Sequence, residues 1–102
     1  MTIDELRRRI DGVDEHLVRL LNERAACALA IGELKRAGGL AVYQPAREAD
    51  VLRHVRAVDA GMGGPLGPGA IGRLFERIID EARRIERVSV SEDRGPLRPQ
   101  EP

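Results

Sequence analysis

The chain has 102 residues, with 17 Lys and Arg against 17 Asp and Glu, so its formal net charge is zero and its length suits one domain with one core. The balanced charge disfavours nucleic acid and anionic membranes as partners, because proteins that bind either usually carry a basic excess or patch. Hydrophobic residues (42%) and charged residues (33%) predict a soluble folded domain, and the longest apolar runs are too short to span a membrane.

Residues 3 to 37 contain no proline, and their apolar residues recur every three or four positions. This spacing predicts one long amphipathic helix, which would measure about 50 Å. Such a helix is longer than a globule of this size is wide, so the chain alone cannot bury its apolar stripe. We therefore expect a homodimer in which this helix pairs across the two-fold axis. The stripe consists of Ile3, Leu6, Ile10, Val13, Leu17, Leu20, Cys27, Ile31 and Leu34.

Two shorter helices are predicted after this one. Gly38 and Gly39 can supply a left-handed cap that ends the first helix, and Pro45 suits the first turn of a helix at about 46–60. The inner side of that helix is expected to carry Val51, Leu52, Val55 and Val58.

The stretch 61–69 is rich in glycine and proline and predicts a loop, but no Gly-Lys-Ser/Thr follows it, which disfavours a phosphate-binding loop. A third helix is predicted at about 70–88. The expected fold is all-α, with residues 1–90 as the helical domain and the proline-rich residues 91–102 as a disordered tail. The apolar face of the third helix consists of Ile71, Leu74, Phe75, Ile78, Ile79, Ala82 and Ile85.

Arg24 interrupts the apolar stripe of the first helix. An isolated charge in a buried seam is costly, so Arg24 needs an acid or an anionic ligand beside it, or it extends to solvent. Lys35 lies about 20° from Arg24 around the helix and about 16 Å along it, so the two cations could bind opposite ends of a small dianion. Arg7 lies about 25 Å from Arg24, and the two could share a ligand only if Arg7 came from another copy of the chain.

Three further polar residues stand at informative positions. Arg47 and Glu48 open the second helix near its positive N-terminus, although either could be an ordinary surface residue. Glu86 continues the apolar face of the third helix, or else marks a solvated helix end. Burial would raise the pKa of Glu86, and Lys35 would lower it.

The sequence shows no arrangement of residues that is typical of covalent or metal-dependent enzymes. His16 and His54 have no partners at ligand spacing, so no metal site is expected. The lone Cys27 is interpreted as a small hydrophobe in the stripe; it excludes an internal disulfide and fits a reducing cytoplasm. Cations with one or two glutamates and no nucleophile suit a reaction that depends on shape and electrostatics, acting on a dianionic ligand.

Six stretches of sequence, in this order along the chain, carry the resemblance to a known family. They are residues 6–11, 13–17, 20–24, 31–35, 45–48 with 51–52, and 74–79. With the spacing of Arg7, Arg24, Lys35, Arg47 and Glu48, they resemble the all-helical chorismate mutases over residues 3–88. The resemblance implies an intertwined homodimer with two equivalent active sites. It also implies a Claisen rearrangement of chorismate to prephenate without cofactor, metal or covalent intermediate.

The resemblance also implies roles for individual residues. Arg24 and Arg47 would bind the two substrate carboxylates, and Arg7 would enter from the partner subunit. Lys35 would donate to the ether oxygen as its bond breaks. The ring hydroxyl would be held by Glu48, helped by the backbone at Gln44.

The sequence departs from the best-known bacterial pattern at three positions. Ala82 stands where a serine often contacts a carboxylate, and Gln44 where an aspartate often lies. Glu86 stands where a glutamine usually donates to the ether oxygen, and a carboxyl group can donate only when protonated.

Glu86 and Gln44-Pro45 also resemble 4-amino-4-deoxychorismate mutases, whose substrate carries an amine in place of the ring hydroxyl. An isochorismate-pyruvate lyase and a non-catalytic helical regulatory dimer are further alternatives. The sequence leaves open an activating partner enzyme, and whether the pathway is primary or secondary.

Overall fold

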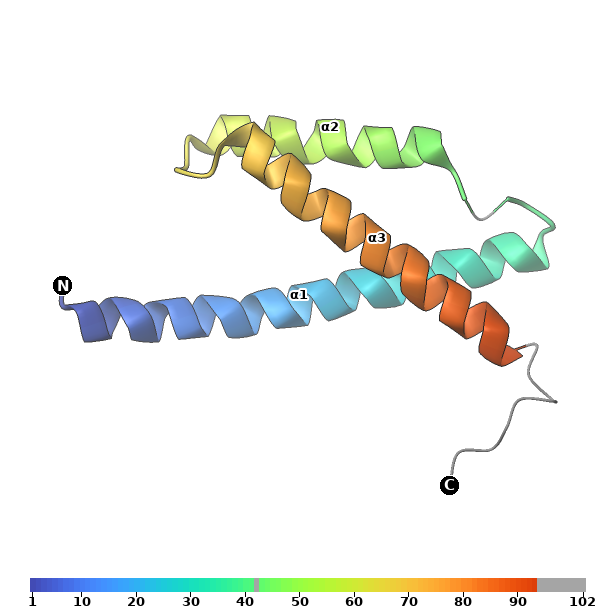
Figure 1. Cartoon of the computed structure of the whole chain (residues 1–102), viewed down its shortest axis with the longest axis horizontal. Helices are drawn as coiled ribbons and strands as arrows, with labels where there is room; N and C mark the ends of the chain where they lie inside the picture. The colour runs from blue at the N-terminus through green and yellow to red at the C-terminus, as the bar shows by residue number, and fades with distance from the viewer. Residues whose placement is uncertain (42, 94–102) are drawn as a thin grey trace, which may run out of the picture.

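The computed structural model describes residues 1–41 and 43–93, and every regular element in that part of the chain is a helix. The elements are α1 (Ile3–Ala37), α2 (Pro45–Met62) and α3 (Gly67–Asp93) (Figure 1). The prediction of an all-α chain with three helices is therefore confirmed. Both later helices are longer than predicted, and α3 includes residues 91–93 of the expected tail, whereas 94–102 lie outside the described residues.

Local sequence signals define both ends of α1. Thr2 accepts a hydrogen bond from the backbone N–H of Glu5 while the Glu5 side chain accepts one from Thr2, forming a capping box. At the other end, the Leu40 N–H donates to the Lys35 carbonyl at 2.7 Å, and Gly39 adopts a φ of 71°. This is the left-handed ending that a glycine permits, so the predicted stop of the first helix is confirmed.

Helix α3 lies along α2 at its start and crosses the C-terminal half of α1 further on (Figure 1). Gly32 is buried where α3 crosses α1. Val51, Leu52 and Val55 of α2 are half-buried, as predicted.

The prediction that Val58 faces inward is wrong, because Val58 is 43% exposed and the neighbouring Asp59 is buried instead. In a helix the residue four positions after Val55 lies closer to its direction than the residue three positions after it. The face that α2 turns toward α3 therefore continues to Asp59. Leu74, on the apolar face predicted for α3, is 53% exposed in the single chain.

The apolar stripe of α1 is largely uncovered in the single chain. Ile10 and Leu17 are 57% and 50% exposed, and among the described residues Ile79 is the one large hydrophobic side chain that is buried, at 7% exposure. The radius of gyration is 17.7 Å, well above the roughly 13 Å of a compact 100-residue domain. Arg24 is only half-buried and Cys27 is exposed, so the seam expected to enclose them is open in the single chain.

Candidate active site

A cavity of about 750 Å³ lies between the C-terminal half of α1, the start of α2 and the C-terminal half of α3. Its lining includes every predicted site residue except Arg7: Arg24, Lys35, Gln44, Arg47, Glu48, Ala82 and Glu86. A cavity of this volume is large enough for a small-molecule ligand. Arg7 lies far along α1, on the half that α3 does not reach.

The wall from α1 combines apolar residues with cations at helical spacing. Arg24, Ala28, Ile31 and Lys35 follow one another at steps of four, three and four, so they share one face. The Lys35 ammonium donates to the Gln44 side-chain oxygen at 3.1 Å. The resemblance gives Gln44 a role through its backbone; in the structure its side chain connects Lys35 to the segment that begins α2.

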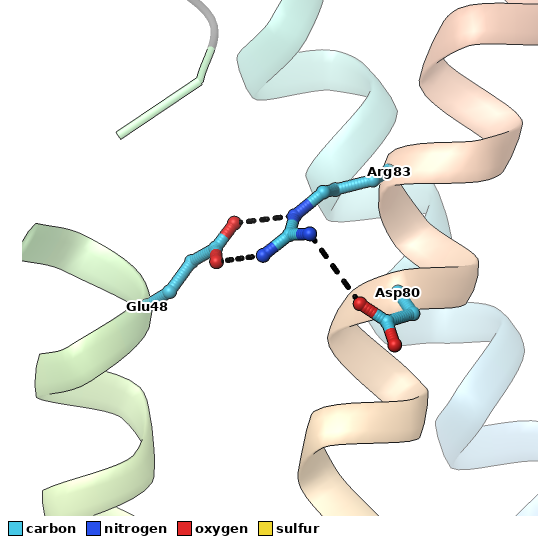
Figure 2. Close-up of polar contacts among 3 residues, drawn as sticks. All are labelled: Glu48, Asp80 and Arg83. Atoms are coloured by element: carbon cyan, nitrogen blue, oxygen red, sulfur yellow. Dashed lines mark hydrogen bonds and ion pairs between the residues drawn. The ribbon is translucent and has the colours of Figure 1, made fainter. Parts of the chain in front are cut away.

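At the start of α2, Pro45 occupies the first turn, and Arg47 and Glu48 follow it into the cavity wall. The Glu48 carboxylate accepts hydrogen bonds from Arg83 of α3 on both oxygens, the Nε to Oε2 bond measuring 2.7 Å (Figure 2). Arg83 also donates to Asp80 at 3.4 Å, and its guanidinium lies 5.3 Å from the centre of the Tyr43 ring. The hydrogen bonds to Glu48 raise the pKa of Arg83.

Arg83 is a site residue that the sequence reasoning missed. The pair that it forms with Glu48 joins residues 35 positions apart, on two different helices. Helical periodicity relates residues three or four positions apart, so it could not signal this contact. The sole local hint is Asp80, three residues earlier on the same helix.

Glu86 lies against the backbone of α1 because Gly32 has no side chain there. A Cβ atom at position 32 would lie 3.8 Å from the Glu86 carboxyl carbon and 3.4 Å from Nη1 of Arg36. Desolvation raises the pKa of Glu86, the charges of Lys35 and Arg36 lower it, and the charge of Glu48 raises it. The expected balance between burial and Lys35 thus ends in a raised pKa.

Arg36 is a second residue that the sequence reasoning did not identify. Its Nη1 atom is buried and has no hydrogen-bond partner among the described residues. It lies beside Glu86 and lines the same cavity. Neither its position after Lys35 nor its residue type distinguishes it in the sequence from a solvated helix end.

The cavity has an excess of positive charge. Among the described residues, six cationic side chains line it against two carboxylates, Glu48 and Glu86, and apolar side chains such as Ile31, Val51 and Ile79 form part of the wall. Such a site favours a compact ligand with more than one negative charge. The cations are Arg24, Lys35, Arg36, Arg47, Arg83 and Arg87.

Two other kinds of feature are absent from the described part of the chain. No group of three or more His, Cys, Asp or Glu residues there could hold a metal ion. None of the helices there is both long and apolar enough to cross a membrane.

Comparison with known proteins gives consistent matches. The family model for chorismate mutase type II matches residues 6–87. A bifunctional chorismate mutase/prephenate dehydratase of Neisseria gonorrhoeae is 47% identical over 90 residues, which are 84% of this chain and 24% of that protein. The chain therefore spans about a quarter of the length of that relative.

Two further relatives match over most of their own length. A 4-amino-4-deoxychorismate mutase of Streptomyces pristinaespiralis is 30% identical over 95 residues, covering 93% of this chain and 72% of that protein. The solved structure of chorismate mutase (form II) from Thermus thermophilus superposes with a TM-score of 0.77 and 33% identity. The superposition covers 83% of this chain and 93% of the other.

Proposed function

The chain belongs to the chorismate mutase type II family, and from this premise we propose that it catalyses the rearrangement of chorismate to prephenate. The observation that supports this most directly is the cavity, whose cations and two glutamates come from three helices. Chorismate is a dianion, and its rearrangement is unimolecular. A site that binds two carboxylates and offers donors to a breaking C–O bond can therefore accelerate it without a nucleophile.

In the proposed complex, Arg24 and Arg47 bind the two carboxylates of the substrate. Guanidinium groups suit this role because they donate paired hydrogen bonds in a geometry that matches a carboxylate. Holding both carboxylates at fixed positions keeps the reacting ends of the substrate close together. Ala82 provides space in the wall and no hydrogen bond.

Lys35 donates to the ether oxygen, where negative charge gathers as the C–O bond breaks. Its ammonium is held at the cavity wall by the contact with Gln44, which lines the same cavity. Glu86 donates to the same oxygen when it is protonated, and its raised pKa increases the protonated fraction at a given pH. Glu48 accepts a hydrogen bond from the ring hydroxyl.

We further propose that the active protein is a homodimer in which Arg7 of the partner subunit completes the site. The exposed stripe of α1 supports this, because Ile3, Leu6, Ile10, Val13 and Leu17 are all at least 44% exposed in the single chain. A continuous apolar surface of that length marks an interaction site in a protein of this size. The free Cys27 is in keeping with work in a reducing cytoplasm.

A second candidate function is rearrangement of 4-amino-4-deoxychorismate. The Streptomyces pristinaespiralis relative favours it, since that match covers more of this chain than the bifunctional relative does. The two candidates differ in one ring substituent, a neutral hydroxyl or a protonated amine. Residues beside Glu48 therefore decide between them.

The test is a steady-state assay of the purified chain with chorismate, 4-amino-4-deoxychorismate and isochorismate. Loss of chorismate absorbance with appearance of prephenate, at a rate proportional to protein concentration, is the expected result. Release of pyruvate from isochorismate would indicate a lyase instead. Chorismate that decays at its uncatalysed rate would contradict the proposal.

A further inference from the structure

We propose that Arg83 sets the substrate preference of this site: by neutralising Glu48, it favours a ring that carries a hydroxyl over a ring that carries an ammonium group. The inference rests on the proposed function, in which Glu48 contacts the ring substituent. It concerns a residue on α3 to which neither the helical pattern nor the family resemblance assigns a role.

Glu48 and Arg83 form an ion pair that joins α2 to α3. Arg83 donates to both carboxylate oxygens of Glu48 and also to Asp80 (Figure 2). Its guanidinium also lies over the face of the Tyr43 ring. The Glu48 side chain is 23% exposed and that of Arg83 38% exposed, so solvent only partly screens the pair. Two-point guanidinium–carboxylate pairs are among the stronger polar contacts in proteins. Both residues line the cavity, so a ligand meets them together.

The pair with Arg83 leaves Glu48 able to accept a further hydrogen bond and offsets its negative charge. A carboxylate has about four lone-pair sites, and Arg83 uses one on each oxygen. A substrate hydroxyl can therefore still donate to Glu48. An ammonium group at the same place gains little from a carboxylate that is already paired, and it lies beside the fixed positive charge of Arg83.

The surroundings of Glu48 strengthen the effect. Glu86 faces the same cavity, and the charge of Glu48 raises the pKa of Glu86, so the two carboxyl groups influence each other. Without Arg83 the negative charge of Glu48 would no longer be offset by a paired guanidinium, and an ammonium group beside Glu48 would be favoured. With Arg83 in place, this wall of the cavity suits a neutral ring substituent.

The experiment compares kcat/KM for chorismate and for 4-amino-4-deoxychorismate at pH 7, where an aliphatic amine is protonated. In the unmodified protein the ratio should favour chorismate. In Arg83→Gln it should fall by about tenfold or more, mainly because kcat/KM for the amine rises. Arg83→Leu, which also lacks the charge and keeps apolar bulk against Tyr43, should behave in the same way and serves if the glutamine variant does not fold.

Two matched variants separate charge from general disturbance of α3. Arg84→Gln removes a neighbouring guanidinium that pairs with Glu81, so the ratio should stay as in the unmodified protein. Arg83→Lys keeps the charge but cannot donate the paired hydrogen bonds, so it should retain more of the preference for chorismate than Arg83→Gln does.

The outcomes distinguish the two proposals. If the unmodified protein rearranges chorismate and the ratio is unchanged in Arg83→Gln and Arg83→Leu, the role of Arg83 is overturned and the proposed function stands. An unmodified protein that prefers the amine overturns the role of Arg83 and makes the second candidate function the correct one. A protein inactive on both substrates overturns both proposals.

Discussion

The two halves of α1 share one amphipathic pattern and have different surroundings. Residues 3–23 are exposed along their whole length in the single chain, whereas the half from Arg24 onward contains half-buried residues and Gly32, which is buried beneath α3. The proposed site residues of this helix fall on both halves, with Arg24 and Lys35 lining the cavity and Arg7 outside it. Periodicity therefore identifies a face that needs a partner, but not whether the partner belongs to the same chain.

The largest effect on assembly and activity is expected from placing a charge in the exposed half of α1, residues 3–23. Leu17→Glu puts an unpaired carboxylate in the proposed dimer interface, where it would cost several kcal/mol, so the dimer and the activity should both be lost. Sedimentation equilibrium measures the mass. Gly12→Glu adds the same charge on the opposite face, where a Cβ would have no atom within 4 Å, and should leave the mass unchanged. A Leu17→Glu protein that still sediments as a dimer would exclude this interface.

The next largest effect is expected from a substitution in the half of α1 that begins at Arg24 and lies against α3. Arg24→Ala removes a charge-assisted contact with a substrate carboxylate. It should lower kcat/KM for chorismate by about 30- to 1,000-fold, equivalent to roughly 2 to 4 kcal/mol in the transition state. Arg8→Ala, on the outer face of the exposed half, should change kcat/KM little. Similar kinetics for the two variants would remove Arg24 from the proposed site.

Mixing variants from the two halves tests whether one site draws on two chains. Arg7→Ala and Arg24→Ala should each have strongly reduced activity alone. After subunit exchange in equal amounts, half of the dimers are mixed and each has one intact site, so about a quarter of the full activity should return. If every site lay within one chain, no mixture would recover activity, and the assay would show no gain over the separate proteins.

The smallest expected effect is a pH dependence of the activity that comes from Glu86, which lies against Gly32 of α1. Because the pKa of Glu86 is raised, its donor form is retained to a higher pH than usual and is lost as pH rises through that pKa. Turnover of chorismate should therefore fall with rising pH, by at most about tenfold per pH unit. Glu86→Gln always offers a donor and should flatten the profile.

Glu81 provides the control for this pH dependence. It lies on the same helix, and a hydrogen bond from Arg84 lowers its pKa. Glu81→Gln should leave the profile of the unmodified protein in place. A profile that is flat in the unmodified protein and unchanged in Glu86→Gln would show that Glu86 does not contact the breaking bond.

Much of the fold could be predicted because its signals are local. Alternating steps of three and four residues defined α1 from residue 3 to residue 37, and the glycines at its end adopt the expected geometry. Predictions for α2 and α3 were less accurate at their ends and at Val58, where the buried residue is Asp59. Which of the two neighbouring residues is buried depends on how α3 packs against α2, and a single helix does not encode that packing.

The three helices, the uncovered stripe of α1 and the cations that need an anion could all be predicted from the sequence, because each follows from spacing along one helix. Which charges meet depends instead on the tertiary structure. The pairing of Arg83 with Glu48, the buried Nη1 of Arg36 and the raised pKa of Glu86 all arise where α3 lies against α1 and α2. Coulombic and desolvation effects depend on distance and burial in space, and residues far apart in sequence reach those distances only in the folded chain.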